Sequence, residues 1–275
     1  MIPGMDAAGL EAEYNNRAKV PAHPAIIARW AEDAAAFRAT HGHAEPGLAY
    51  GPNERQALDL FWPGPKRTAP LALFLHGGYW QGLHRSFFSH YARGLLAHGV
   101  AVAVPSYDLC PDVSLDVIVG QVRDCAAFLF RRHARPMLAA GHSAGGHLAA
   151  MLMATNWGLR GLPSIISAGL PISGLFDLAP LVPTSINAAL RLDTETARQL
   201  SPLFMTPPGR PLHAVVGGEE GCEYTRQSRE LALAWGGTWE ALPGDNHFTV
   251  AAGLAEPDST LVRGALALLA EAGPG

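Results

Sequence analysis

Short apolar runs alternate with helical patterns along most of the chain. Apolar residues at three- and four-residue spacing predict helices, and unbroken apolar runs of five or six residues suit strands buried on both faces of a parallel sheet. The runs cover residues 71–75, 100–104, 137–141 and 212–217, and the helical patterns cover 86–98, 114–132, 144–156, 224–235 and 259–272. This alternation predicts βαβ units, and therefore an α/β fold whose mostly parallel central sheet carries helices on both faces.

Two regions depart from this alternation. Residues 1–45 are rich in alanine and predict an N-terminal helical extension, with a helix over 25–40. Residues 178–210 hold several prolines and a short helical pattern, which predicts a cap-like insert. Segments 47–50 and 56–62 predict antiparallel edge strands at the front of the sheet, and residues 238–242 predict its last strand. The amino-acid composition does not change along the chain in a way that would mark a second domain, so the prediction is one domain over residues 1–275.

Composition narrows the class of protein. Of 275 residues, 48% are apolar and 16% are charged, which predicts a large core rather than disorder. The net charge is -4 and no basic stripe occurs, so nucleic acid is not an expected partner. No export signal and no apolar stretch of roughly 20 residues stand out, so we expect a cytoplasmic protein without a membrane partner. Cys110, Cys125 and Cys222 are too few and too far apart for a disulfide framework or a CxxC metal site.

The clearest chemical signal is Gly141-His142-Ser143-Ala144-Gly145, which fits G-x-S-x-G. A predicted strand precedes the motif and a predicted helix follows it. This context produces a sharp turn that exposes a serine hydroxyl, and only small residues fit on either side of it. The positive end of the following helix points to the same place. Ser143 is therefore the candidate nucleophile.

A second signal, His76-Gly77-Gly78-Tyr79-Trp80, comes directly after the predicted strand 71–75. Glycines after this strand let backbone N–H groups approach a developing oxyanion closely. The expected donors are Gly78 and Tyr79 from this loop, together with Ala144, the residue after the nucleophile. His76 and His142 lie inside the two motifs, where structural hydrogen bonding is expected rather than proton transfer.

In hydrolases with a G-x-S-x-G turn, the catalytic residues follow one another along the chain in the order serine, acid, histidine, which indicates where the acid and the histidine should lie. His247 follows the last predicted strand and precedes the terminal helix, which suits the catalytic base. The acid is expected after strand 212–217, where Glu220 is the first candidate and Glu219 the second. Asp177, which follows the preceding strand, and Asp245 are less favoured. No HExxH or comparable metal pattern occurs, so no metal or cofactor is expected.

These motifs resemble the α/β-hydrolase superfamily, and within it the kynurenine formamidase (arylformamidase) group. The resemblance covers nearly the whole chain and rests on the leader Tyr14-Asn15-Asn16-Arg17, HGGYW at 76–80, GHSAGGHLA at 141–149, Ser173 to Asp177, and Ser201-Pro202. It implies the α/β-hydrolase fold and registers the triad acid onto Glu220, where the family usually has aspartate.

The resemblance implies a serine hydrolase that removes a small, formyl-type acyl group from an aryl amide or ester. The bulk of Tyr79 in the oxyanion loop is expected to exclude longer acyl groups. Aromatic and insert residues are expected to line the leaving-group side: Trp80, Phe87, Phe88, Trp157, Phe176 and Asn187. The expected partner is a small-molecule substrate, and a homodimer is left open.

Two other functions are compatible with the same motifs. A general short-chain carboxylesterase or carbamate hydrolase would use the same scaffold, because one fold hosts many chemistries. A non-catalytic binding protein of hydrolase fold would not need an intact triad, and such a protein would resist a fluorophosphonate probe. A kinetic comparison of N-formylkynurenine with short-chain nitrophenyl esters would separate formamidase from esterase.

Overall fold

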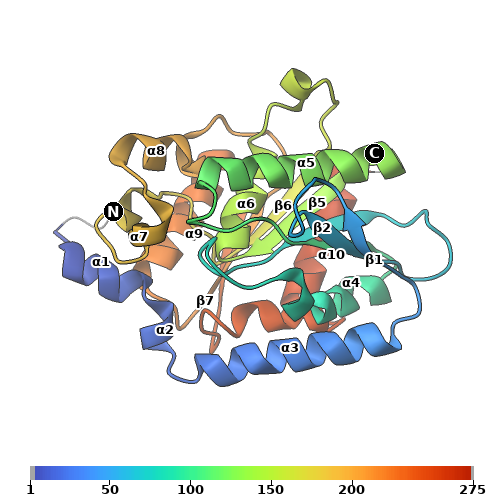
Figure 1. Ribbon diagram of the computed structural model, residues 1–275, viewed down its shortest axis with the longest axis horizontal. Coiled ribbons are helices and arrows are strands. Elements are labelled where there is room, and N and C mark those ends of the chain that lie inside the picture. The colour runs from blue at the N-terminus through green and yellow to red at the C-terminus, as the bar shows by residue number, and fades with distance from the viewer. Residues whose placement is uncertain (1–3, 274–275) are drawn as a thin grey trace.

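The computed structural model describes residues 4–273, and within them the strands form one eight-stranded sheet (Figure 1). The spatial order is β1-β2-β4-β3-β5-β6-β7-β8. β1 and β2 pair antiparallel, as do β2 and β4, and the other neighbours pair parallel. The strands are β1 (Ala44–Ala49), β2 (Ala57–Phe61), β3 (Leu71–Leu75), β4 (Ala101–Pro105), β5 (Met137–His142), β6 (Ile166–Ile172), β7 (His213–Gly217) and β8 (Thr238–Leu242). The predicted mostly parallel α/β sheet with antiparallel strands at its front is confirmed.

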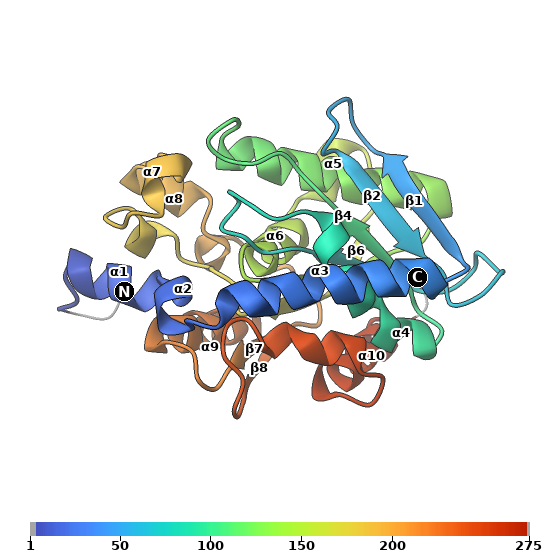
Figure 2. The ribbon, with the colours of Figure 1, turned by 60° about the horizontal axis from the view of Figure 1, so that its bottom comes forward.

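Helices cover both faces of this sheet. Their bounds are α1 (Ala7–Tyr14), α2 (Asn16–Lys19), α3 (His23–Thr40), α4 (Arg93–Ala97), α5 (Leu115–His133), α6 (Ala144–Met153), α7 (Asn187–Leu190), α8 (Thr194–Gln199), α9 (Cys222–Trp235) and α10 (Thr260–Ala272). α5 and α6 lie on one face, and α3, α4 and α10 on the other (Figures 1 and 2). Each central strand is buried on both faces, which explains its unbroken apolar sequence.

The alternation of side chains along β3 divides the core between the two faces. Leu71, Leu73 and Leu75 pack in the cluster that contains the buried residues of α5, α6 and α9. Ala72 and Phe74 pack in the cluster that contains those of α3, α4 and α10. Because successive side chains of a strand point to opposite faces, one short apolar run supplies both halves of the core.

Two elements differ from the predicted pattern. The helix predicted over 86–98 is divided into short 3₁₀ turns at Arg85–Phe87 and Ser89–Ala92, followed by α4. Phe88 and Tyr91 in this segment are buried between α3 and β3, and their packing overrides the helical pattern. The helix predicted over 144–156 ends at Met153.

The strand expected before Asp177 is β6, which is not an unbroken apolar run because it contains Ser167, Gly169 and Pro171. The N–H of Gly169 donates to Pro211 O and that of Ser173 to Val215 O, so Pro171 between them faces the β7 side. Its missing N–H leaves a gap in the β6–β7 ladder, which has few pairs.

The N-terminal extension and the 178–210 segment meet at one end of the molecule. α7 lies beside α1, and α8 lies next to α7 (Figures 1 and 2). The N–H and the hydroxyl of Ser185 both donate to the Glu11 carboxylate, at 2.8 and 2.7 Å. Gln81 of the loop after β3 donates to Ile186 O at 2.9 Å. These bonds hold the first helix and the segment against the loop that carries the HGGYW motif.

Two further findings concern the described residues as a whole. No helix in residues 4–273 is both long and apolar enough to cross a membrane. The three cysteines are free thiols; Cys110 and Cys125 are buried, and Cys222 is exposed.

Candidate active site

Ser143 lies at the sharp turn between β5 and α6. Its φ is +57° and its ψ is −120°, a conformation that non-glycine residues rarely adopt. Glycines on either side permit the turn. A Cβ on Gly141 would lie 2.2 Å from Gly145 O, and a Cβ on Gly145 would lie 1.9 Å from Leu75 O. The strain therefore falls on the residue whose hydroxyl must project from the turn.

Three side chains from distant parts of the chain meet at this turn. Nε2 of His247 lies 2.9 Å from Oγ of Ser143, and Nδ1 of His247 lies 2.6 Å from Oε2 of Glu220. A carboxylate can only accept, so the neutral imidazole carries its proton on Nδ1 and leaves Nε2 to accept from the serine hydroxyl. This arrangement has the geometry of an activated nucleophile, its base and an orienting acid.

The Glu220 carboxylate is completely buried, yet it is held ionised. Burial by itself would raise the pKa of this carboxyl group, but His247 and the hydrogen bonds from Ser173 Oγ and Gly217 N–H hold the pKa below its usual range. Ser173 has a φ of +47°, so a second strained residue orients the acid. Ser173-Gly174 is part of the family resemblance, but no local pattern along the chain indicated that Ser173 contacts the acid.

The other three candidates for the acid beside His247 do not contact its imidazole. Glu219 is exposed, and its backbone N–H, not its carboxylate, reaches the histidine loop by donating to Asp245 O. Asp177 accepts from Ala179 N–H and lies 3.7 Å from Arg226. Asp245 accepts from the hydroxyl of Thr249 at 2.8 Å. Of the four carboxylates, Glu220 is the one in contact with the His247 imidazole.

The HGGYW loop is strained and presents backbone N–H groups beside Ser143. Gly78, Tyr79 and Trp80 have φ values of +114°, +52° and +57°. A Cβ on Gly78 would lie 2.4 Å from Gly82 O, so no other residue fits there. Within residues 4–273, the N–H groups of Gly78 and Tyr79 have no main-chain acceptor, and Ala144, the first residue of α6, has none by helix geometry. These three N–H groups remain able to bind an oxyanion.

His76 and His142 support this loop and the triad. His76 Nδ1 donates to Gly77 O at 2.7 Å, and His142 Nε2 donates to His247 O at 2.8 Å. Burial lowers the pKa of each imidazole to about 3, so both are neutral near pH 7. This agrees with the expectation of structural hydrogen bonding.

A chain of hydrogen bonds joins the oxyanion loop to the N-terminal extension. Asn16 Nδ2 donates to the Tyr224 hydroxyl at 2.8 Å, the Tyr224 and Tyr79 hydroxyls are 2.7 Å apart, and the Tyr79 hydroxyl donates to Tyr14 O at 2.5 Å. Because the one hydroxyl proton of Tyr79 is donated to Tyr14 O, the Tyr224 hydroxyl must donate to the Tyr79 hydroxyl oxygen. The Tyr224 ring lies 4.8 Å from that of His247, so this chain also borders the triad.

A small cavity of about 50 Å³ opens onto the reactive side chains. It is walled by residues of the N-terminal extension, the HGGYW loop and the histidine loop: Asn16, Arg17, Ile27, Trp30, Gly77, Gly78, Tyr79, Leu83, His142, Ser143, His247 and Phe248. It is several times smaller than the two depressions that adjoin it. We call it the nucleophile cavity.

The six residues expected on the leaving-group side do not line the nucleophile cavity, and their role in substrate binding stays a prediction. Five are aromatic and pack in the core or against it: Trp80, Phe87, Phe88, Trp157 and Phe176. Asn187 closes its own loop by donating to Val182 O and Leu192 O. Apolar aromatics gain more from burial in the core than from lining an open site, and sequence order alone did not distinguish the two.

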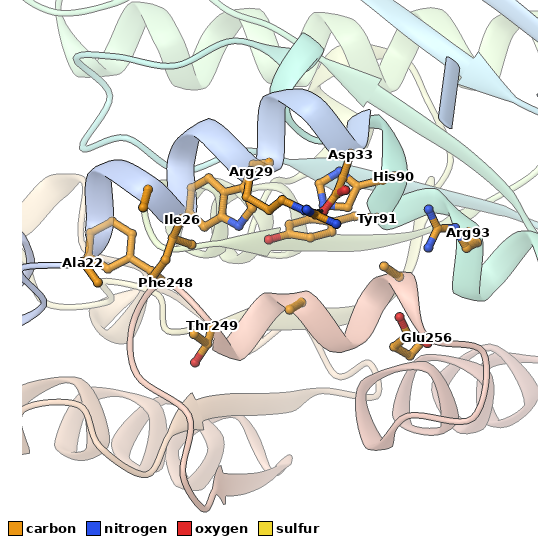
Figure 3. Close-up of a pocket in the computed structure, with 14 residues that line it drawn as sticks. Ala22, Ile26, Arg29, Asp33, His90, Tyr91, Arg93, Phe248, Thr249 and Glu256 are labelled. Carbon is orange, nitrogen blue, oxygen red and sulfur yellow. Dashed lines mark hydrogen bonds and ion pairs between the residues drawn. The ribbon is translucent and has the colours of Figure 1, made fainter. Parts of the chain in front are cut away.

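Two larger depressions adjoin the nucleophile cavity. A polar pocket of about 380 Å³ shares Asn16, Arg17, Gly78 and Tyr79 with it, and is completed by Glu11, Tyr14, Asn15, Gln81, Gly82, Ser185 and Ile186. A groove of about 560 Å³ between α3 and the histidine loop shares Trp30 and Phe248 with it. Figure 3 shows Phe248 beside Ala22 and Ile26 at one end of this groove, with Arg93 and Glu256 toward the other.

No group of three or more His, Cys, Asp or Glu side chains that could hold a metal ion occurs in the described part of the chain.

The chain is similar to several known proteins in sequence and in structure. The kynurenine formamidase of Salmo salar is 30% identical over 231 residues, which cover 78% of this chain and 79% of the relative. A crystal structure from Silicibacter sp. TM1040, provisionally described as a thioesterase, is 34% identical with a TM-score of 0.88, covering 94% of this chain and 98% of that one. A hyperthermophilic esterase from Pyrobaculum calidifontis shares the fold, with 16% identity and a TM-score of 0.72 over 96% of this chain and 93% of its own.

No family model matches the chain. The relative of 30% identity covers most of both proteins and bears out the resemblance found in the sequence, and the structural neighbours share the fold. The chain is a hydrolase that belongs to the kynurenine formamidase family of the α/β-hydrolase superfamily.

Proposed function

We propose that this hydrolase is a serine-dependent arylformamidase that cleaves the formyl amide of N-formylkynurenine or a close aromatic analogue. The observation that carries the proposal is the continuous hydrogen-bonded path from Ser143 through His247 to Glu220, at the mouth of a cavity of about 50 Å³. The family relatives named kynurenine formamidase direct the choice of substrate.

In the acylation step, His247 Nε2 takes the proton of Ser143 as Oγ attacks the formyl carbonyl carbon. Glu220 orients the imidazole and stabilises its positive charge. The N–H groups of Gly78, Tyr79 and Ala144 stabilise the oxyanion of the tetrahedral intermediate. The C–N bond then breaks, and His247 gives its proton to the leaving aryl amine.

Deacylation repeats the same chemistry with water. His247 removes a proton from water, which attacks the formyl-serine ester and forms a second tetrahedral intermediate at the same N–H groups. Collapse of this intermediate releases formate and returns the proton from His247 to Ser143 Oγ.

The size of the nucleophile cavity supports a one-carbon acyl group. Trp30 and Phe248 close it with rings that stack 6.1 Å apart, and Trp30 is 5% exposed, so the wall is well packed. A formyl group adds one carbon and one oxygen, whereas each added methylene must displace packed side chains. The larger polar pocket beyond Gly78 and Tyr79 suits the leaving group.

A substrate panel tests the function. We expect kcat/KM to be higher for N-formylkynurenine than for nitrophenyl acetate, butyrate and octanoate. The Ser143→Ala variant should lose at least three orders of magnitude in kcat on every substrate, because the residual catalysis comes only from binding and the oxyanion donors. A wild-type preference for the nitrophenyl esters would instead identify a short-chain carboxylesterase.

A further inference from the structure

One guanidinium stands at the boundary between the nucleophile cavity and the polar pocket. Arg17, in α2, lines both spaces and has an exposed side chain. Among the described residues it makes no hydrogen bond or ion pair, whereas Lys19 on the same short helix lies 3.3 Å from the Glu13 carboxylate. Arg17 therefore presents an uncompensated positive charge next to the place where the leaving group must go.

The other polar side chains at this boundary already form hydrogen bonds within the protein. Asn16 donates to Tyr224, and Tyr79 donates to Tyr14 O. Glu11 accepts from the N–H and the hydroxyl of Ser185. These bonds lower the pKa of Glu11, so this carboxylate remains charged in the same pocket. The pocket thus carries one free cation near the reactive serine and one ionised, fixed carboxylate.

We propose that Arg17 is a specificity-determining residue that binds the carboxylate of the leaving group, so that the preferred substrates are N-formyl aryl amines bearing an α-amino acid end. The inference rests on the proposed function, whose substrate carries such an end. The planar guanidinium can hold a carboxylate with two parallel hydrogen bonds. Glu11, which lines the same pocket, is the acceptor for the substrate ammonium group.

The placement matches the order of groups in such a substrate. The formyl carbon lies at Ser143, the aryl ring follows past Gly78 and Tyr79, and the charged end reaches Arg17, Glu11 and the Ser185 loop. No step of the proposed mechanism uses the Arg17 guanidinium, so its effect is expected on binding. Because its side chain is exposed and its field is screened by salt, we expect an effect of about tenfold in KM rather than a complete loss.

The experiment compares two substrates of the same chemistry, N-formylkynurenine and formanilide, which lacks the amino acid end. The Arg17→Gln variant should raise KM for N-formylkynurenine about tenfold with kcat unchanged, and leave formanilide kinetics as in the wild type. Arg17→Lys should recover part of the loss, because an ammonium keeps the charge but not the paired hydrogen bonds. Added salt should raise KM for N-formylkynurenine in the wild type and much less in Arg17→Gln.

Arg229→Gln is the matched control, since Arg229 is an exposed arginine of α9 that lines neither the nucleophile cavity nor the polar pocket. An unchanged KM in Arg17→Gln would overturn the proposal, and so would an equal loss on both substrates, which would indicate a structural role.

Failure of the proposed function would be visible separately, as wild-type enzyme that cleaves neither formyl amide. In that case phenyl acetate and its carboxylate-bearing analogue 4-acetoxybenzoate provide the same comparison for Arg17. A selective rise in KM for the carboxylate ester in Arg17→Gln would support carboxylate binding by Arg17, and equal kinetics on the two esters would overturn it.

Discussion

The two spaces on either side of the oxyanion loop differ in size, polarity and origin. The nucleophile cavity, about 50 Å³, has a largely apolar wall built by α3 and the loops after β3, β5 and β8. The polar pocket, about 380 Å³, is built by the first two helices, the HGGYW loop and the Ser185 loop. Under the proposed function, one catalytic centre selects its acyl group by steric packing and its leaving group by charge.

Gly78 and Tyr79 belong to both spaces, and their position is maintained from outside the loop. The hydrogen-bonded chain from Asn16 through Tyr224 and Tyr79 to Tyr14 O connects the boundary to α1, α2 and α9. Buried networks of this kind stabilise a single arrangement when every member has a partner. The N-terminal extension therefore contributes to the site as well as to the core.

The largest effect should come from Glu220, because its contact with His247 matters for every substrate, whichever acyl or leaving group it carries. Glu220→Ala should lower kcat about 10³- to 10⁴-fold on formyl amides and acetyl esters alike, because it removes the group that orients His247. Steady-state kinetics on both substrate types would measure this. Glu219→Ala is the control and should stay within about twofold of wild type, since its side chain is exposed. A loss confined to one substrate type would contradict the idea of a shared centre.

A smaller effect should appear when the wall of the nucleophile cavity is thinned. Trp30 lines both this cavity and the groove of about 560 Å³ shown in Figure 3. Trp30→Leu should join the two spaces and raise kcat/KM for nitrophenyl butyrate relative to acetate by about tenfold, the range that a methylene or two is worth in an apolar pocket. KM for N-formylkynurenine should change much less.

The control for Trp30 is Trp157→Leu. Trp157 is 3% exposed and packs in the core away from the cavity, so its replacement should lower stability without changing the butyrate-to-acetate ratio. If both variants shift the ratio equally, general loosening of the core rather than the cavity wall sets acyl selectivity.

The smallest effect should come from Tyr79→Phe, which keeps the ring and removes the hydroxyl. The Tyr224 hydroxyl would lose its acceptor and Tyr14 O its donor, at a cost of about 1–3 kcal/mol in unfolding free energy. We expect a several-fold decrease in kcat. Denaturant unfolding and kinetics measure the two quantities. Tyr50→Phe removes a buried hydroxyl that donates to Ser106 O, and should lower stability with kcat unchanged.

Local motifs were the most predictable part of the site. Ser143 could be located because a strained turn between a buried strand and a helix admits only small neighbours, and Gly141 and Gly145 satisfy that demand within five residues. The HGGYW loop was predictable for the same reason, since the close approach at Gly78 excludes any side chain. The alternation of apolar runs and helical patterns likewise predicted the mostly parallel sheet.

The cavity walls were not predictable in this way. Trp30 and Phe248 close the nucleophile cavity, whereas Trp80 and Phe176 pack in the core, although all four are aromatic residues. Which side of a helix or loop faces a cavity depends on where the sheet twist and the neighbouring elements place it. That information is spread over segments more than 200 residues apart, as in the contact of Asn16 with Tyr224.

The sequence by itself predicted the α/β fold class, the strained serine turn and the glycine-rich HGGYW loop, because each depends on short-range sterics or hydrophobic periodicity. The order of catalytic residues along the chain predicted the position of His247. Only the tertiary structure placed the carboxylate of Glu220, and not that of Glu219, against His247, and brought Arg17 to the boundary of the two spaces. Adjacent carboxylates look alike along the chain, but the fold buries one of them against His247 and leaves the other in water. The physical reason is that the turn after β7 directs successive side chains to opposite sides, and only the side facing the imidazole compensates a buried charge.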